Sequence, residues 1–353
     1  MIQLTAPARP AVQDLLVQTG WAKSVGGSLR GWSALQLMPK CPRLAYLQMV
    51  CGLQSQKPSD AMDQGVLYHA CMESHYASGG RDTLGPLRAV ESAVPEIAAN
   101  VRRLIDAKFR RYGVEEAETW DIRAVEHEVI ARVKGKARVG AYRRRVIEAP
   151  VSSKFDLIIA KRERNGPYAQ FGPVKTGVWA FDHKTTGRLS RDKVGGFGMD
   201  PQFLLMAYNW RKARLDRVFG PLLGFIIEIV VATKEVGIER IEVRVDDRDA
   251  DRYIQEMSSW FVDIESMLAL PPEERARQEL WPMNFAGCRQ AYGLCKYFDL
   301  CESHGAYRSL YTVAEGFVPA KALVEQRVRH RRVAQASEVP LTAPAPGSHE
   351  RSQ

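Results

Sequence analysis

A change in hydrophobic pattern after Trp120 constrains the fold more than any other feature of the sequence. Before it, apolar residues recur with helical spacing, whereas beyond it they form short runs rich in Val, Ile and Phe, which is typical of strands. The expected elements are strands at 121–133, 152–161 and 177–185, a helix at 200–215, strands at 222–233 and 237–245, and a helix at 249–270. This order predicts an α/β fold, in which helices flank a mixed β-sheet core.

The chain of 353 residues is expected to hold one folded domain between two segments of different composition. The N-terminal extension is punctuated by proline and glycine, and the C-terminal tail lacks the apolar content that folding requires. The expected boundaries are an extension at 1–32, a domain at 33–332 and a disordered tail at 333–353. Within the domain we expect a helical part at 33–120, the sheet core at 121–270 and a cysteine region at 271–310.

Composition argues against a membrane-spanning or secreted protein. Hydrophobic residues make up 45% and charged residues 26%, as in globular proteins, and no run of about 18 apolar residues occurs. The first residues have neither the cationic start nor the apolar core of a secretory signal, so a cytoplasmic location is expected. Six cysteines in a reducing compartment favour metal, cluster or core roles over disulfides.

The formal net charge of +9 favours polyanionic partners. The excess is concentrated in residues 102–111, 134–145 and 327–332. Such runs are often only solvated surface, but they also suit the backbone of a nucleic acid. Within the second run, Arg143, Arg144 and Arg145 are the predicted nucleic-acid-binding residues.

The strand expected at 177–185 ends with an acid and an amine on one face. Side chains alternate along a strand, so Asp182 and Lys184 share a face and His183 points to the other. A solvated strand end with a stray ion pair would give the same pattern. The neighbouring strand decides which interpretation is preferred.

Asp156 lies in the middle of the strand expected at 152–161. Its neighbours Phe155 and Leu157 are apolar and are expected to point away from it. A carboxylate in mid-strand costs free energy unless something pairs with it. If the two strands are neighbours, two carboxylates and a lysine meet, and that group suits a hard cation such as Mg²⁺. The lysine could then act on a water molecule or on phosphate charge.

The series Asp156 and, about 25 residues later, Asp182-His183-Lys184 resembles the D…(D/E)-x-K signature of the PD-(D/E)XK nuclease superfamily. Residues 63–74, "DQGVLYHACMES", resemble the helical G-x-x-x-H element of the RecB-like branch, with His69 at the position of a metal ligand.

Two more elements resemble the same branch. Residues 124–129, "AVEHEV", resemble its strand with a glutamate before the first aspartate, which Glu126 matches, although Glu128 lies on the same face. "DPQFLLMAY" resembles its Q-x-x-x-Y helix. Gln202 matches the first position, whereas the fourth residue after it is Met206 and the nearest tyrosine is Tyr208.

The resemblance implies a restriction-endonuclease-like fold that holds one or two Mg²⁺ or Mn²⁺ ions. The implied ligands are His69, Asp156, Asp182 and the backbone carbonyl of His183. Lys184 would orient the attacking water, Glu126 would support the metal or the water, and Gln202 and Tyr208 would touch the scissile strand. The implied products carry a 5′-phosphate and a 3′-hydroxyl.

The cysteines suggest a second inorganic site. Cys288, Cys295 and Cys301 are separated by six and five residues, longer gaps than structural zinc sites use. Cys41 lies at an expected helix N-cap followed by a proline, where the helix dipole favours a thiolate. One cysteine before the core and three after it resemble the iron–sulfur nucleases of the AddB and CRISPR-adaptation type. The resemblance implies a [4Fe–4S] cluster joining both ends of the domain, and zinc or buried core thiols are the alternatives.

The sequence therefore predicts a metal-dependent DNA nuclease, most similar to phage-encoded exonucleases of the RecB-like branch, in a phage or bacterial host cell. DNA with single-stranded or double-stranded ends would be its partner, together with unidentified recombination or replication proteins. A spacer-processing nuclease of the CRISPR-adaptation type shares every motif and is one alternative. A catalytically inactive iron–sulfur DNA-binding protein is another, but the intact His/Asp/Asp/Lys set argues against it.

Overall fold

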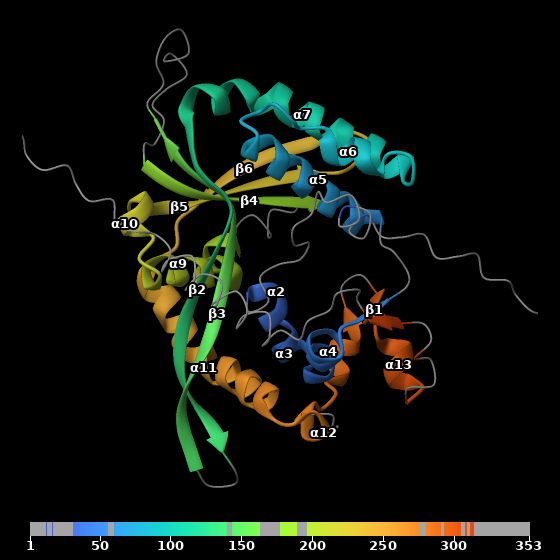
Figure 1. Ribbon diagram of the computed structural model, residues 1–353, viewed down its shortest axis with the longest axis vertical. Coiled ribbons are helices and arrows are strands. Elements are labelled where there is room, and N and C mark those ends of the chain that lie inside the picture. Colours follow the sequence, from blue (N-terminus) through green and yellow to red (C-terminus); the bar gives the residue numbers. More distant parts are fainter. Residues whose placement is uncertain are drawn as a thin grey trace, which may run out of the picture.

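Figure 1 shows the computed structural model of the protein. The structure describes residues 12, 16, 31–55, 60–139, 143–162, 177–188, 196–275, 280–290, 293–304, 308 and 311–313. The expected tail at 333–353 and nearly all of the extension at 1–32 lie outside these residues. Within them, no helix combines the length and the apolar character needed to cross a bilayer.

A five-stranded mixed sheet forms the centre of the fold, as the strand pattern predicted. Its strands are β2 (Trp120–Val139), β3 (Arg143–Lys161), β4 (Gly177–Thr186), β5 (Leu222–Val231) and β6 (Gly237–Val243), in the order β2-β3-β4-β5-β6. The β4–β5 pair is parallel and the other three pairs are antiparallel. Both β2 and β3 are longer than the sequence indicated.

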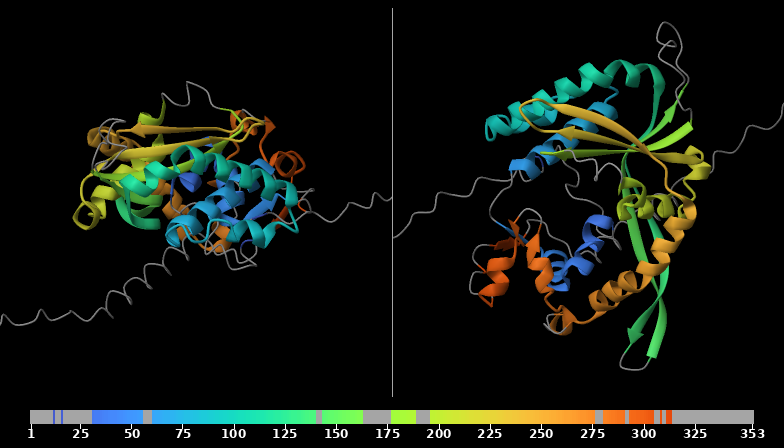
Figure 2. Two further views of the ribbon diagram at one scale, coloured as in Figure 1. Left: turned by 90° about the horizontal axis from the view of Figure 1, so that it is seen from above. Right: turned by 180° about the vertical axis from the view of Figure 1, so that it is seen from behind.

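Helices cover both faces of this sheet (Figures 1 and 2). One face packs against α5 (Asp60–Ala77), α6 (Gly85–Val90) and α7 (Pro95–Thr119), and the other against α9 (Pro201–Lys212) and α11 (Asp247–Ala269). Along β4, Trp179 and Phe181 join the first core, whereas Val178 and Ala180 join the second. The alternation predicted for this strand is confirmed.

Short elements from the two ends of the described chain meet away from the central sheet. The N-terminal ones are α2 (Trp32–Leu35), α3 (Leu37–Lys40), α4 (Pro42–Ala45), a π-helical turn (Tyr46–Val50) and β1 (Leu53–Ser55). The C-terminal ones are a 3₁₀ turn (Phe285–Cys288), β7 (Arg289–Gln290), β8 (Gly293–Leu294), α13 (Phe298–Glu302) and β9 (Tyr311–Val313). Strands β1 and β9 pair antiparallel and so join the two ends. The remaining elements are a 3₁₀ turn (Phe197–Met199), α10 (Asp216–Phe219) and α12 (Pro272–Arg275).

Strands β2 and β3 continue beyond the sheet as a two-stranded ribbon that lies along α11 (Figure 2). We call residues 127–139 and 143–155 the β2–β3 arm. In the arm, Phe155 is buried in the core shared with α9 and α11, but in the sheet Leu157 is buried on the α5–α7 side. The expectation that both point to one side, away from Asp156, was therefore wrong. Between Phe155 and Leu157 the ribbon turns over, so its two faces change places where the arm leaves the plane of the sheet.

Strand β2 is irregular at the same place. Register shifts between Ile122 and Ala124, and Glu126 has a φ of 51°, a left-handed value that side chains other than glycine rarely adopt. Val125 pairs with Leu157 and His127 with Phe155, so the register sets Glu126 opposite Asp156. A strained residue opposite the predicted catalytic aspartate and a bulge beside Ile158 and Ile159 thus accompany the bend of the ribbon.

Candidate active site

Asp156 lies where β3 and β4 separate. Their last ladder pair is Leu157 with Phe181, and continued register would set Asp156 opposite Asp182. Instead, Oδ2 of Asp156 accepts the backbone N–H of His183 at 2.9 Å. The carboxylate takes the place of a strand-to-strand hydrogen bond, so the backbone polar group stays satisfied where the strands part.

Asp182, Lys184 and Gln202 form a closed group beside this opening. Nζ of Lys184 is 2.7 Å from Oδ2 of Asp182 and donates to Oε1 of Gln202 at 3.0 Å. Nε2 of Gln202 donates to Oδ1 of Asp182 at 2.8 Å. Gln202 is placed by the start of α9, where Asp200 caps the helix by accepting the Gln202 backbone N–H at 2.8 Å. Pro201 occupies the first helical position, where its missing N–H costs nothing.

Helix α5 brings His69 to the same place. Its Nδ1 is 3.4 Å from Oδ2 of Asp156, and the ring is partly exposed. Gly65 lies one turn earlier on the helix, and a Cβ there would be 2.8 Å from Oγ1 of Thr185 on β4. The glycine therefore allows α5 to approach β4 closely, which is a physical reason for the G-x-x-x-H spacing.

The two carboxylates differ electrostatically. Burial raises the pKa of Asp182, although Lys184 opposes the shift. Burial also acts on Asp156, but His69 and His183 outweigh it and lower the pKa of that carboxyl. Attraction to Asp182 similarly outweighs burial at Lys184 and raises the pKa of its amine, while burial lowers the pKa of His69. Lys184 is thus a cation held against the less well compensated carboxylate.

Two sequence-predicted site residues lie apart from this group. Glu126 forms an ion pair with Lys154, two residues before Asp156 on β3. Tyr208 donates from its hydroxyl to the carbonyl of Arg132 in the arm at 3.2 Å and is buried beneath it, so the structure does not bring it to the site. Arg143, Arg144 and Arg145 begin β3, and their side chains lie outside the described residues.

Carboxylate oxygens and an imidazole are donors that suit Mg²⁺ or Mn²⁺. In the described part of the chain, however, no three His, Cys, Asp or Glu side chains are arranged so that they could hold a metal as they stand. At Asp182, Lys184 and Gln202 take both oxygens. The donor chemistry fits a divalent cation, because Oδ2 of Asp182 is buried and has no hydrogen bond among the described residues, although it is ion-paired with Lys184.

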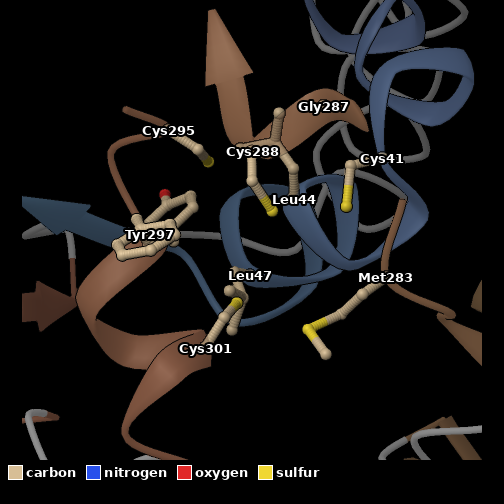
Figure 3. Close-up of a pocket in the computed structure, with 10 residues that line it drawn as sticks. Cys41, Leu44, Leu47, Met283, Gly287, Cys288, Cys295, Tyr297 and Cys301 are labelled. Carbon is tan, nitrogen blue, oxygen red and sulfur yellow. The ribbon is translucent and has the colours of Figure 1, made fainter. Parts of the chain in front are cut away.

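Four cysteines gather in one pocket at the junction of the chain ends (Figure 3). They are Cys41, Cys288, Cys295 and Cys301. Cys41 is the N-cap of α4, with Pro42 at the first helical position, as predicted. The backbone N–H of Asn284 donates to Sγ of Cys41 at 3.4 Å. Thiols are the kind of donor that zinc and iron–sulfur clusters take, but these four, like the acidic group, are not arranged to hold a metal as they stand in the described chain.

Sequence analysis missed Glu228, which accepts from the His183 ring. Nδ1 of His183 lies 3.0 Å from Oε1 of Glu228, and Glu228 is fully buried in β5. The available signal was a single acid inside the apolar run "GFIIEIVVA". The same desolvation argument that drew attention to Asp156 applies to it.

A mixed sheet with two aspartates and a lysine at a strand separation defines a nuclease-like α/β protein. The family model of the PD-(D/E)XK nuclease superfamily matches residues 32–302, and the chain belongs to this superfamily. Among curated proteins, none matches the sequence.

Two solved structures are similar to the chain. One is the crystal structure of a presumed exonuclease from Eubacterium rectale, with 13% identity and a TM-score of 0.39 over 86% of this chain and 94% of that one. The other is the protein SSO0001, with 13% identity and a TM-score of 0.22 over 59% of this chain and 84% of that one.

Proposed function

We propose that the protein is a divalent-metal-dependent deoxyribonuclease that degrades DNA from its ends. The observation that carries this proposal is the meeting of Asp156, Asp182 and Lys184 at the separation of β3 and β4, with Gln202 and His69 in contact with them. Membership of the nuclease superfamily gives the substrate class. The preference for an exonuclease rests on the resemblance to the RecB-like branch.

The site would hold Mg²⁺ or Mn²⁺ through His69, Asp156, Asp182 and the carbonyl of His183. When bound, such an ion polarises the phosphodiester and stabilises the leaving oxygen. The raised pKa of Asp182 supports its role, because a carboxylate that is buried with little compensation gains from a cation.

The protein's own side chains would do the remaining work. Lys184 stays protonated, so it is suited to orienting the attacking water and to stabilising charge on the phosphate. Gln202 bridges Lys184 and Asp182 and would hold their relative positions. Glu126 would support the metal or the water only if it gave up Lys154. A contact between Tyr208 and the scissile strand would need its hydroxyl to leave Arg132.

The β2–β3 arm would bind the DNA backbone. Arg132, Lys134 and Lys136 are exposed at alternate positions of β2, so they share a face about 7 Å apart. Glu148 pairs with Arg132 and Lys134 at 3.5 and 3.3 Å. Such exposed ion pairs contribute little to the stability of the fold, so they can open and leave both cations to the DNA. Arg143, Arg144 and Arg145 extend this basic surface in sequence, and the surface would bind without base specificity.

The cysteine pocket would hold a [4Fe–4S] cluster, with zinc as the alternative. Support comes from the meeting of four thiols from two distant segments in one pocket. A spacer-processing nuclease of the CRISPR-adaptation type would use the same two sites. A catalytically inactive DNA-binding protein would have no need of the Lys184–Asp182–Gln202 group.

End-labelled linear DNA, incubated with Mg²⁺ or Mn²⁺, tests the proposal directly. We expect metal-dependent release of 5′-phosphorylated products from linear DNA and none from covalently closed circular DNA. Cutting of the circle would indicate an endonuclease. If neither substrate is cut with either ion while DNA is still bound, the inactive alternative is correct.

A further inference from the structure

Three residues form a row across β4, β5 and β6 behind the active site. His183 is the register partner of Glu228, and Glu228 is the register partner of Arg240. His183 and Glu228 are 3% and 0% exposed. The rings of Tyr68 and Tyr76 from α5 pack against His183, so the row lies on the α5–α7 face. It therefore lies on the side of β4 opposite to Asp182 and Lys184.

Every oxygen of Glu228 in this row has a partner. Oε1 faces Nδ1 of His183 at 3.0 Å and accepts the Tyr68 hydroxyl at 3.0 Å. Oε2 accepts from Nε and Nη2 of Arg240 at 2.9 and 2.6 Å. An ionised carboxylate can only accept, so the proton of the His183 ring must be on Nδ1. Nε2 of His183 is buried and has no hydrogen-bond partner among the described residues.

A second buried ion pair completes the charge balance. Arg240 also pairs with Glu116, and Nζ of Lys108 is 2.5 Å from Oε2 of Glu116. In the described chain this network has two acids and two bases, so it is neutral when His183 is uncharged. The two hydrogen bonds that the Arg240 guanidinium donates to Oε2 favour the ionised form of Glu228. The ionised state of Glu228 is thus stable.

We infer that Glu228 is a positioning residue: by holding the His183 ring in one tautomer from behind the sheet, it fixes the orientation of β4 at the point where Asp182 and Lys184 project into the site. The backbone N–H of His183, which binds Asp156, belongs to the same residue. A rotation of β4 at His183 would therefore disturb both aspartates together. The expected effect on catalysis rests on the proposed nuclease function, whereas the tautomer of the His183 ring follows from its contact with Glu228.

The experiment compares two double variants, each of which removes one buried acid and one buried base and so leaves the network neutral. Glu228→Met with Arg240→Met removes the partner of His183. Glu116→Met with Lys108→Met is the matched control, because Glu228 then still contacts His183 and is still paired with Arg240. Calorimetry with Mn²⁺, steady-state kinetics on linear DNA and thermal unfolding are measured on both.

If Glu228 positions the site, the Glu228/Arg240 variant loses Mn²⁺ affinity or kcat by about 10- to 100-fold, as is typical when the group that orients a ligand is removed. The control keeps its Mn²⁺ affinity and kcat within about two-fold of the parent's, although its melting temperature falls by a comparable amount. Equal losses in the two variants would mean that the row only stabilises the fold, and the inference would be wrong.

Nitrogen NMR of ¹⁵N-histidine protein without metal gives a second, activity-independent readout. The parent and the control should show His183 as a single Nδ1–H tautomer, and the Glu228/Arg240 variant should show a mixture. An Nε2–H tautomer in the parent overturns the inference even if the variant does not fold. If the parent binds Mn²⁺ and shows the Nδ1–H tautomer but cuts no DNA, the proposed function fails while the positioning of the site stands.

Discussion

The carboxylate of Asp156 occupies the place of a backbone carbonyl in the β3–β4 ladder, because its Oδ2 accepts the His183 N–H at 2.9 Å. The residue therefore has a structural role at the strand separation as well as its expected role at the metal. The separation of β3 from β4 also explains why the site lies beside Asp156. The β3–β4 ladder ends at Leu157 and Phe181, and the β2–β3 arm bends away from β4 there (Figure 1).

Asp182 and Lys184 should differ in the kind of loss that their substitution causes. Asp182→Asn removes the charge that would hold the cation, so Mn²⁺ binding and cleavage should fall together. Lys184→Ala frees Oδ2 of Asp182 from its partner, so Mn²⁺ binding should survive or tighten while cleavage falls by about 10²- to 10⁴-fold. Calorimetric titration beside a nuclease assay measures both quantities. Cleavage by Lys184→Ala within a few-fold of the parent would exclude a catalytic lysine.

Gly65 should tolerate no larger side chain at the α5–β4 contact. Gly65→Ala places a Cβ 2.8 Å from Oγ1 of Thr185, and we expect α5 to move away from β4, at a cost of about 1–3 kcal/mol in unfolding free energy. The movement shifts His69 away from Asp156, so Mn²⁺ affinity should fall as well. Denaturant unfolding and calorimetry measure the two effects.

Gly113→Ala in α7 is the matched control, because its Cβ would make only ordinary contacts, at 3.5 and 3.6 Å from Phe109. It should leave Mn²⁺ affinity unchanged and increase stability by about 0.5–1 kcal/mol, the usual effect in a helix interior. Thr185→Ala, added to Gly65→Ala, should restore part of the stability and of the Mn²⁺ affinity that Gly65→Ala loses. A Gly65→Ala protein that is as stable as the parent and binds Mn²⁺ equally well would mean that the Thr185 side chain relieves the contact and α5 does not move.

The central sheet and the faces of its strands could be predicted from the sequence because their signals are local. Alternation in β4 sets the faces of Asp182 and Lys184, and Asp200 with Pro201 marks the start of the helix that carries Gln202. Each inference needed only neighbouring residues. The order of the elements then supplied the mixed sheet.

What could not be predicted depends on contacts between distant segments. The exchange of ribbon faces at Asp156 follows from the strained backbone of Glu126 in another strand. The row from His183 to Arg240 depends on the register of three strands, and register is set by packing. Tyr208 lies under the arm because α9 packs against β2 and β3, a contact between segments that are distant in the sequence.

Arg143, Arg144 and Arg145 should contribute to DNA binding through charge alone. Replacing all three with glutamine should weaken affinity equally for all sequences and should flatten its dependence on salt, because fewer counterions are released. Filter binding or fluorescence anisotropy at several salt concentrations measures the slope. Arg102, Arg103 and Arg110 on α7, replaced in the same way, remove the same charge from the basic segment at 102–111. Equal slopes in both variants would mean that neither segment is a specific contact surface.

The cysteine pocket should bind iron and sulfide in protein purified without oxygen. Such protein should be brown, with broad absorbance near roughly 400 nm from thiolate-to-iron charge transfer. Cys295→Ala should bleach the colour and lower the melting temperature, because the pocket joins segments from both ends of the chain. Cys71→Ala changes a buried thiol of α5 outside the pocket and should keep the colour. A colourless parent with one zinc per chain and full activity would establish the zinc alternative.

His75 should make the fold sensitive to mild acid. It lies between α5 and α7, where Nδ1 faces Oγ1 of Thr83 at 2.8 Å and the ring packs on Phe109. Burial, assisted by the nearby Lys108 ammonium, lowers its pKa to about 4 from 6.5. Between these values the unfolded chain binds a proton that the folded chain does not, so stability falls as the pH drops from about 6.5 towards 4.

His75→Asn keeps a polar group near Thr83 but cannot titrate in this range. Its unfolding free energy should therefore change less between pH 6.5 and 4 than that of the parent, even if it is lower at neutral pH. Urea unfolding of both proteins across this range measures the difference, and carboxylates that titrate nearby contribute equally to the two curves. Parallel curves would show that His75 takes up its proton in the folded protein as easily as in the unfolded one.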